Sequence, residues 1–179
     1  MAAKALSVGR YYGVAMSKIY TCLWFDHGQA EEAARLYTSL IPNSEITNVS
    51  RSPADTPSGP AGMVLTVDFT LDGVPYQGLN GGPDFKLSEA ASIAVECDDQ
   101  AEVDRLWDAL VAGGGEHSVC GWLKDRFGLS WQVYPRRLAE LLADPDPDRA
   151  RRAMEAMLEM TKIETAELEA AADGARTSA

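Results

Sequence analysis

The segment CGWLKDRFGLSWQVYP, residues 120–135, brings a thiol, two indoles, a carboxamide and a phenol into one predicted hairpin. The pattern predicts a strand through Trp122, a turn over residues 125–128 and a second strand over residues 129–134. Alternation gives the second strand two faces, one with Leu129, Trp131 and Val133 and the other with Ser130, Gln132 and Tyr134. The Gln132 carboxamide, opposite the apolar face, would offer a ligand hydrogen bonds or a metal one weak oxygen.

Side chains that carry acid–base or nucleophilic chemistry are scarce. The chain has two histidines, and His27 is predicted at a strand–helix junction and His117 in the loop before the hairpin. We interpret both as surface or loop residues, with an acid–base role at a cavity mouth as the alternative for His117. No Ser-His-Asp or Cys-His arrangement follows from the spacing.

The three cysteines, Cys22, Cys97 and Cys120, form an odd set without CxxC spacing. This argues against a disulfide framework and against a zinc ribbon. Cys22 and Cys97 lie in apolar, strand-like runs and are predicted to be buried free thiols. Free thiols indicate a reducing compartment, so we expect a cytoplasmic protein. The role of Cys120 is left open.

The 179-residue chain is 46% hydrophobic and carries a formal net charge of −11, a composition typical of globular proteins. The negative charge repels phosphate backbones, so nucleic acid is not an expected partner. No window has the length and apolar character of a transmembrane helix, and Lys4 and Arg10 interrupt the apolar stretch near the N-terminus, so no membrane is expected either. Residues 1–17 are expected to form a loose extension, with Met16 as an alternative start.

The predicted elements follow one order twice along the chain. The first half reads as a strand, a helix and three strands, at residues 19–25, 30–41, 45–51, 63–70 and 74–80. The second half reads as a strand over residues 91–97, a helix ending before Gly113 and the two strands of the hairpin. The strand–Asp–helix unit recurs after about 72 residues, which indicates an internal repeat. Pro75 predicts an edge strand or a bulge.

Both helices of the repeat begin with a capping-box pattern, Asp26 with Gln29 and Asp99 with Glu102. After the hairpin, residues 138–142 are predicted as helix, and the DPDP sequence at residues 144–147 ends it and starts the next helix. The apolar stripe of that next helix is Ala150, Met154, Met157 and Leu158. A last helix is expected over residues 165–172 and a loose tail over residues 173–179.

Three segments, CLWFDHGQAEEAARLY, LNGGPDFKLSEAASIAVECDDQAEVDRLW and CGWLKDRFGLSWQVYP, together with the C-terminal helical sequence, resemble the PhnB-like branch of the vicinal oxygen chelate (glyoxalase, bleomycin resistance and dioxygenase) superfamily. This branch is often labelled 3-demethylubiquinone-9 3-methyltransferase. The resemblance implies an α+β fold in which paired βαβββ modules form a cupped mixed sheet, followed by C-terminal helices. It implies a domain over residues 18–135, with modules at 18–80 and 91–135, and helices over 136–172 packed on the domain or on a dimer interface.

The resemblance also implies where ligand side chains would lie. Metal-dependent relatives place four ligands, mostly His and Glu, at positions that fall here at about Thr21, Ser92 and Gln132, with a fourth near Gln77 or Leu79. These residues are poor metal ligands, so we expect no metal and no other cofactor. The expected ligand-cavity residues are Thr21, Asn80, Ser92, His117, Trp122, Gln132 and Tyr134.

The methyltransferase label disagrees with the glycines, because an S-adenosylmethionine site of the Rossmann type needs a strand, a Gly-rich turn and a helix in close succession. Residues 113–115 follow a helix, and Gly81-Gly82 precede a sequence without helical periodicity. We therefore expect a metal-independent small-molecule-binding protein, with a superfamily enzyme (lyase, isomerase or transferase) on a small organic or phosphonate-type substrate as the alternative. A homodimer is expected, with Met154, Met157 and Leu158 at its contact. The ligand is not identified by the sequence.

Overall fold

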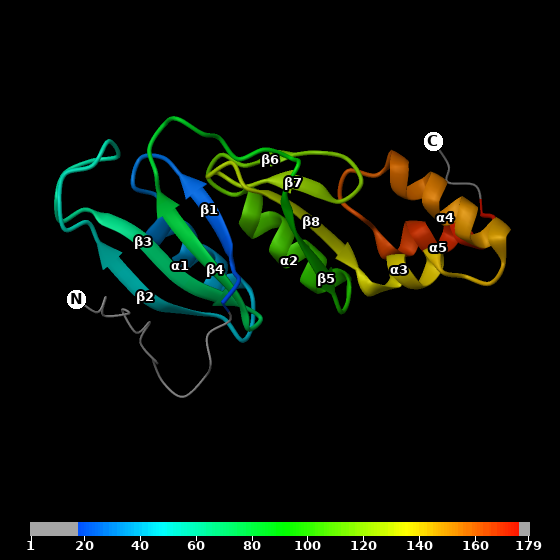
Figure 1. Cartoon of the computed structure of the whole chain (residues 1–179). Helices are drawn as coiled ribbons and strands as arrows, with labels where there is room; N and C mark the ends of the chain where they lie inside the picture. The colour runs from blue at the N-terminus through cyan, green and yellow to red at the C-terminus, as the bar shows by residue number, and fades with distance from the viewer. Residues whose placement is uncertain (1–17, 176–179) are drawn as a thin grey trace. The chain divides into compact units, whose positions relative to one another are not determined.

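The computed structural model describes residues 18–175, which form two compact units, one ending at Pro83 and the other beginning at Asp84. Each unit contains one four-stranded mixed sheet, and helices accompany both sheets, so the fold is α+β (Figure 1). The expectations for residues 1–17 and for 176–179 of the tail lie outside the described residues. Within residues 18–175, no helix has the length and apolar character needed to cross a membrane.

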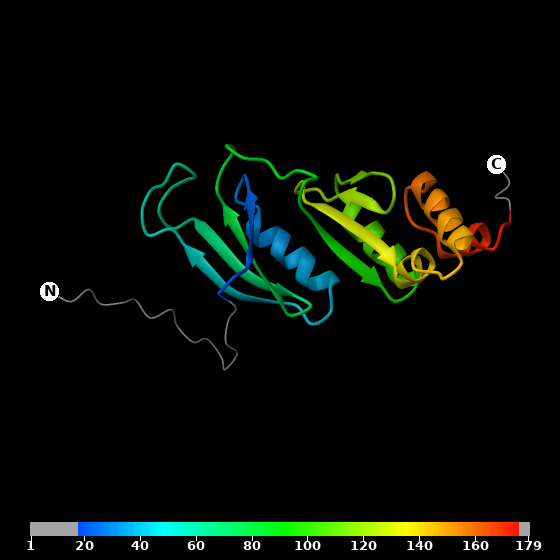
Figure 2. The same cartoon turned by 45° about the vertical axis from the view of Figure 1, so that its right-hand side comes forward.

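Unit 1 is a βαβββ module. Its elements are β1 (Thr21–Phe25), α1 (Ala30–Leu40), β2 (Glu45–Arg51), β3 (Val64–Leu71) and β4 (Val74–Asn80). The strands run in the order β1-β4-β3-β2, with β1 parallel to β4 and the other pairs antiparallel. Helix α1 packs on β3 and β4 (Figures 1 and 2). The core between them is made of Leu23, Phe25, Ala33, Tyr37, Val67 and Phe69.

Unit 2 repeats this topology. Its elements are β5 (Ser92–Cys97), α2 (Gln100–Val111), β6 (Glu116–His117), β7 (Trp122–Lys124) and β8 (Ser130–Pro135). The order β5-β8-β7-β6, with β5 parallel to β8, corresponds strand by strand to unit 1. The predicted repeat is therefore confirmed. The short strand β6 was not expected, because a two-residue pairing leaves no periodicity in the sequence.

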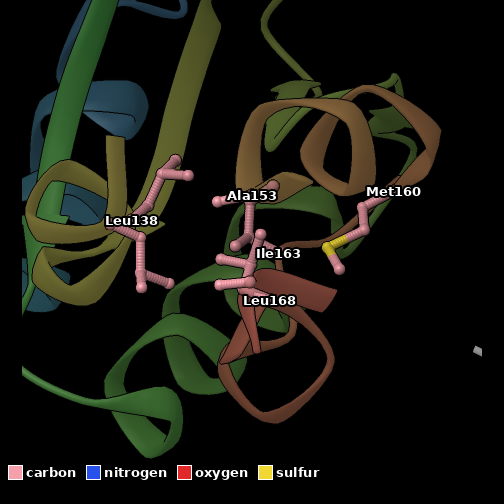
Figure 3. Close-up of a cluster of buried hydrophobic side chains, with 7 residues drawn as sticks. Leu138, Ala153, Met160, Ile163 and Leu168 are labelled. Carbon is pink, nitrogen blue, oxygen red and sulfur yellow. The ribbon is translucent and has the colours of Figure 1, made fainter. Parts of the chain in front are cut away.

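Three helices follow β8 and have a core of their own. They are α3 (Arg136–Leu142), α4 (Pro147–Glu159) and α5 (Thr165–Ala172). Figure 3 shows side chains from α3, α4, α5 and the α4–α5 connection pointing toward one another. This cluster is Leu138, Leu141, Ala153, Met160, Ile163, Leu168 and Ala172. The predicted start of α4 is confirmed, because the Asp146 carboxylate accepts from the Asp148 amide at 2.9 Å and Pro147 follows it.

The predicted apolar stripe of α4 lies partly against the core and partly on the surface of the chain. Ala153 is the buried residue of this helix, and Met157 packs against the C-terminal cluster. Met154 and Leu158, by contrast, are 41% and 54% exposed. The helix therefore turns a narrow small-residue face to the core, and Met154 and Leu158 lie on its exposed side.

The capping prediction holds for α2 and fails for α1. The Asp99 carboxylate accepts from the Glu102 amide at 2.9 Å, and the Glu102 carboxylate accepts from the Asp98 amide at 2.9 Å. Gln29 is itself the N-cap of α1 and has no side-chain capping bond. Instead, Asn80 caps α1 from the end of β4, because its Oδ1 accepts from the Ala30 amide at 2.9 Å. A cap that comes from a distant strand leaves no local pattern in the sequence.

The expectation that Pro75 marks an edge strand or a bulge is also wrong. Strand β4 lies between β1 and β3, and Pro75 pairs regularly with Thr70 of β3. The pairing of β4 with β1 begins only at Tyr76, so the missing N–H of Pro75 faces no partner strand. The predicted hairpin turn before it is confirmed, since Asp72 and Gly73 have φ values of 45° and 74°.

We predict that Asn80→Ala destabilises the protein by about 1–3 kcal/mol, because it leaves the buried Ala30 N–H without an acceptor and removes the bond from Asn80 Nδ2 to the Val64 carbonyl. Gln29→Ala is the matched control and should change stability by less than about 0.5 kcal/mol, since Gln29 makes no side-chain cap. Urea unfolding of both variants measures the difference. Equal losses would show that Asn80 does not hold the start of α1.

Candidate functional site

The two faces of β8 are as the alternation predicts. Trp131 and Val133 are fully buried, and Leu129 is nearly so. The Trp131 indole N–H donates to Asp125 Oδ2 at 2.9 Å, while Asp125 Oδ1 accepts from the amides of Phe127 and Leu129. Asp125 is 3% exposed and thus holds both the hairpin turn and the tryptophan. The turn position of Asp125 follows from the sequence, but its bond to Trp131 does not, because the carboxylate reaches across the hairpin to the indole.

The opposite face of β8 carries polar side chains. Gln132 Nε2 donates to Ser92 Oγ at 2.9 Å, which joins two of the predicted cavity residues across β8 and β5. Ser130 precedes them on the same face and is 1% exposed, and its hydroxyl has no hydrogen-bond partner among the described residues. Within residues 18–175, the Gln132 carbonyl oxygen also makes no hydrogen bond, so the carboxamide retains acceptor capacity.

A pocket of about 300 Å³ opens over this face. It includes three of the predicted cavity residues, Trp122, Gln132 and Tyr134. Its complete lining is Cys120, Trp122, Gln132, Tyr134, Leu138, Ala139, Leu142 and Met157. Apolar and aromatic walls with one carboxamide, one phenol and one thiol are typical of small-molecule sites. No lysine, arginine, aspartate, glutamate or histidine is among these lining residues.

The register of the strands assigns an equivalent residue in unit 1. Gln132 lies opposite Ala94 in the β5–β8 pair, and Gln77 lies opposite Cys22 in the corresponding β1–β4 pair. Gln77 is half-buried, and its Nε2 donates to Asp68 Oδ1 at 2.8 Å. The sequence held a signal for this match, because an aromatic residue precedes the glutamine in both strands, as Tyr76-Gln77 and Trp131-Gln132.

Thr21 does not belong with this set of polar residues. It pairs with Tyr76, so it shares the sheet face of the core residues Leu23 and Phe25. Gln77 and Leu79, the suggested fourth positions, lie on the opposite face, together with Cys22. The expected position on β1 was therefore one residue too early, and a one-residue shift along a strand reverses the face.

Asn80 and His117 lie in structural contacts. Both polar atoms of the Asn80 side chain are bonded inside unit 1, to the Ala30 amide and the Val64 carbonyl. His117 lies on β6, not in a loop, and its Nδ1 accepts from the Trp107 indole N–H at 3.0 Å. The two rings are stacked with centroids 5.5 Å apart. Neither residue lines the pocket of unit 2.

Two of the three thiols are held protonated by their surroundings. Burial raises the pKa of the Cys97 thiol to about 12. Partial burial, followed by the nearby Asp68 carboxylate, raises the pKa of Cys22. The side chain of Cys22 is nevertheless exposed, which corrects the expectation of a buried thiol, because alternation places it on the face away from α1. Neither environment favours the thiolate that a nucleophile requires.

Acidic, histidine and cysteine side chains do not converge on a metal site in the described part of the chain. Within residues 18–175, no group of three or more such side chains is placed to hold a metal ion. Ser92 and Gln132, which the resemblance places at ligand positions, bond to each other. Their donor set is a hydroxyl and a neutral carboxamide, which does not fit a catalytic zinc or another divalent transition metal.

Comparison with known proteins identifies relatives of this chain. The model of a family described as 3-demethylubiquinone-9 3-methyltransferase matches residues 17–134. The solved structure of the PhnB protein from Bacillus cereus is 33% identical and covers 66% of this chain and 99% of its own, with a TM-score of 0.59. A protein from Pseudomonas aeruginosa is 22% identical over 65% of this chain and 96% of its own, with a TM-score of 0.49. Among curated proteins, none matches significantly.

We predict that substitutions at two neighbouring residues of β8 differ strongly in their effect on stability. Trp131→Ala should destabilise the protein by roughly 3–5 kcal/mol, because it leaves a cavity in the core and removes the indole N–H that donates to Asp125 Oδ2. Gln132→Leu should change stability by less than about 1 kcal/mol, because its carboxamide lies at a pocket. Thermal melting of both variants measures this. A severe loss for Gln132→Leu with a neutral Trp131→Ala would show that the faces are reversed.

Proposed function

The chain belongs to the 3-demethylubiquinone-9 3-methyltransferase family, the PhnB-like branch of the vicinal oxygen chelate superfamily, and from this premise we propose that it binds a small molecule in the pocket of unit 2 without a catalytic metal. The observation that carries the proposal is the Gln132 carboxamide between aromatic walls. Its amide N–H is oriented by Ser92, and its carbonyl oxygen is left to accept from a ligand. Trp122 and Tyr134 beside it offer flat apolar surface.

Binding by protein groups alone is supported by the chemistry of the pocket lining. A carboxamide and a phenol can hold a polar ligand by hydrogen bonds, but they supply no charge to offset a dication. The lining also contains no carboxylate and no imidazole that could transfer a proton near neutral pH. These features favour a binding protein over the alternative, a superfamily enzyme acting on a small organic or phosphonate-type substrate.

Methyl transfer is not part of the proposal, although the family description names it. Gly113 has a φ of 78° and follows the end of α2, where it acts as a C-terminal cap. Gly81 and Gly82 follow β4, but the next element is the strand β5. Neither glycine group lies between a strand and the start of a helix, which is the arrangement that binds nucleotide-like cofactors in Rossmann folds.

A cytoplasmic location without a nucleic-acid partner is also proposed. All three cysteines are free, as expected in a reducing compartment. The net charge of −11 opposes binding to nucleic acid. The pocket and its polar groups belong to one unit of one chain, so ligand binding requires no second protein in this proposal.

We predict that Gln132→Leu weakens binding of a neutral amide probe, benzamide, by about 1–3 kcal/mol, because the probe loses one hydrogen-bond partner. Gln77→Leu is the matched control, since Gln77 is the equivalent residue of unit 1 and should leave affinity unchanged. Calorimetric titration measures both, with and without a chelator. Equal losses for the two variants, or loss of binding on adding the chelator, would contradict the proposal.

We further propose a homodimer through α4. Met154 and Leu158 lie one turn apart and are 41% and 54% exposed, which gives this helix an apolar surface outside the core. Met154→Glu with Leu158→Glu should shift sedimentation from dimer to monomer, because the charges would enter an apolar contact. A wild-type monomer, or an unchanged dimer for the double variant, would contradict this interface.

A further inference from the structure

The pocket of unit 2 has two walls of different origin. Trp122, Gln132 and Tyr134 come from the sheet, whereas the opposite wall comes from α3 and α4 and includes Leu142 and Met157. Both helices lie beyond residue 134, where the match to the family model ends. The polar groups of the pocket are thus concentrated on the sheet and at Cys120, and the helical wall is apolar.

The helical wall is held in a defined position against the sheet. The amides of Cys120 and Gly121, which precede β7, donate to the carbonyls of Met160 and Thr161 at 2.7 and 2.9 Å. A side chain at Gly121 would approach the Val133 carbonyl to 2.8 Å and Ile163 to 3.0 Å, so only glycine permits this close contact.

A second set of contacts fixes the α4–α5 connection, to which Met160 and Thr161 belong, against α2. Gln100 donates to the Ile163 carbonyl at 3.1 Å and accepts from the Thr165 amide at 2.8 Å. Lys162 pairs with Asp104 of α2 at 2.5 Å. The connection that follows α4 is thus bonded both to the segment before β7 and to α2. This preorganises the helical wall, which can then discriminate between ligands by shape.

The two arginines that lie between the lining residues Tyr134 and Leu138 in the sequence are paired. Arg136 pairs with Glu96 and Asp98, and Arg137 pairs with Glu140 and Glu169. None of these residues lines the pocket. A phosphonate or carboxylate in the pocket would lose its hydration without meeting a cation, which is costly, whereas a neutral molecule would not.

We infer that the α3–α4 wall selects the ligand, an uncharged molecule with one hydrogen-bonding end at Gln132 and an apolar end against Leu142 and Met157. The inference rests on the proposed binding function and adds the ligand class and the residue that limits its length. Met157 sets that limit, because it packs against the C-terminal cluster and still lines the pocket. Its unbranched side chain borders the apolar end of the pocket, so a bulkier residue at this position would shorten the pocket.

The test uses the full chain and two neutral probes, benzamide and 4-propylbenzamide, with benzoate and phenylphosphonate as anionic counterparts. Benzamide should bind the wild-type protein at least about tenfold more tightly than either anion. Met157→Phe should lower the affinity for 4-propylbenzamide relative to benzamide by about tenfold, and Met157→Ala should shift the ratio the other way. Met154→Phe and Met154→Ala, on the same helix but outside the pocket, should leave the ratio unchanged.

Each outcome bears on one part of the inference, provided that melting curves show the variants to be folded. Equal effects of the Met154 and Met157 variants, or no effect of either, overturn the selecting wall. The binding proposal stands in that case if Gln132→Leu still weakens benzamide. Tighter binding of benzoate or phenylphosphonate overturns the uncharged ligand class, and absence of benzamide binding overturns it as well. Binding that no Gln132 variant affects overturns the proposed function itself.

Discussion

The hydrogen bond from the Trp131 indole to the buried Asp125 carboxylate is the contact on which the arrangement of unit 2 depends. It commits one face of β8 to the core, and the period of two along a strand then commits Gln132 to the other face. The same carboxylate accepts from two amides of the turn, so turn, register and core are fixed together. The pocket is a consequence, because the polar face of β8 is the face over which α3 and α4 pack.

Local patterns were sufficient for most elements of the fold. The bounds of β2, β4 and α5 agree with the sequence prediction, and the cap and first residue of α4 were given by Asp146 and Pro147 alone. What the sequence did not reveal depends on partners distant along the chain. Asn80 caps α1 from fifty residues away, and β6 exists only because it pairs with β7. Such contacts have no periodicity, so local reasoning cannot find them.

The candidate site shows the same division. Trp122, Gln132 and Tyr134, which alternation and resemblance indicate as cavity residues, line one pocket, and Ser92 bonds to Gln132 as a neighbour on β5. Thr21 was assigned one residue out of phase, because the parallel register of β1 with β4 is not encoded in either strand alone. Met157 packs against the C-terminal cluster and also lines the pocket, which an apolar helical stripe alone does not indicate, because it does not say which surface it covers.

We propose that one ligand lies between the polar sheet face and the apolar helical wall of unit 2. Heteronuclear NMR of the full chain tests it most directly, because signals from both walls can be followed in one titration with benzamide. We predict that the signals of the Trp122 indole N–H, the Gln132 side-chain amide and the Met157 methyl group shift together, with one common dissociation constant. Shifts at Gln77 and its neighbours in unit 1, with the signals of Trp122, Gln132 and Met157 unchanged, would contradict it.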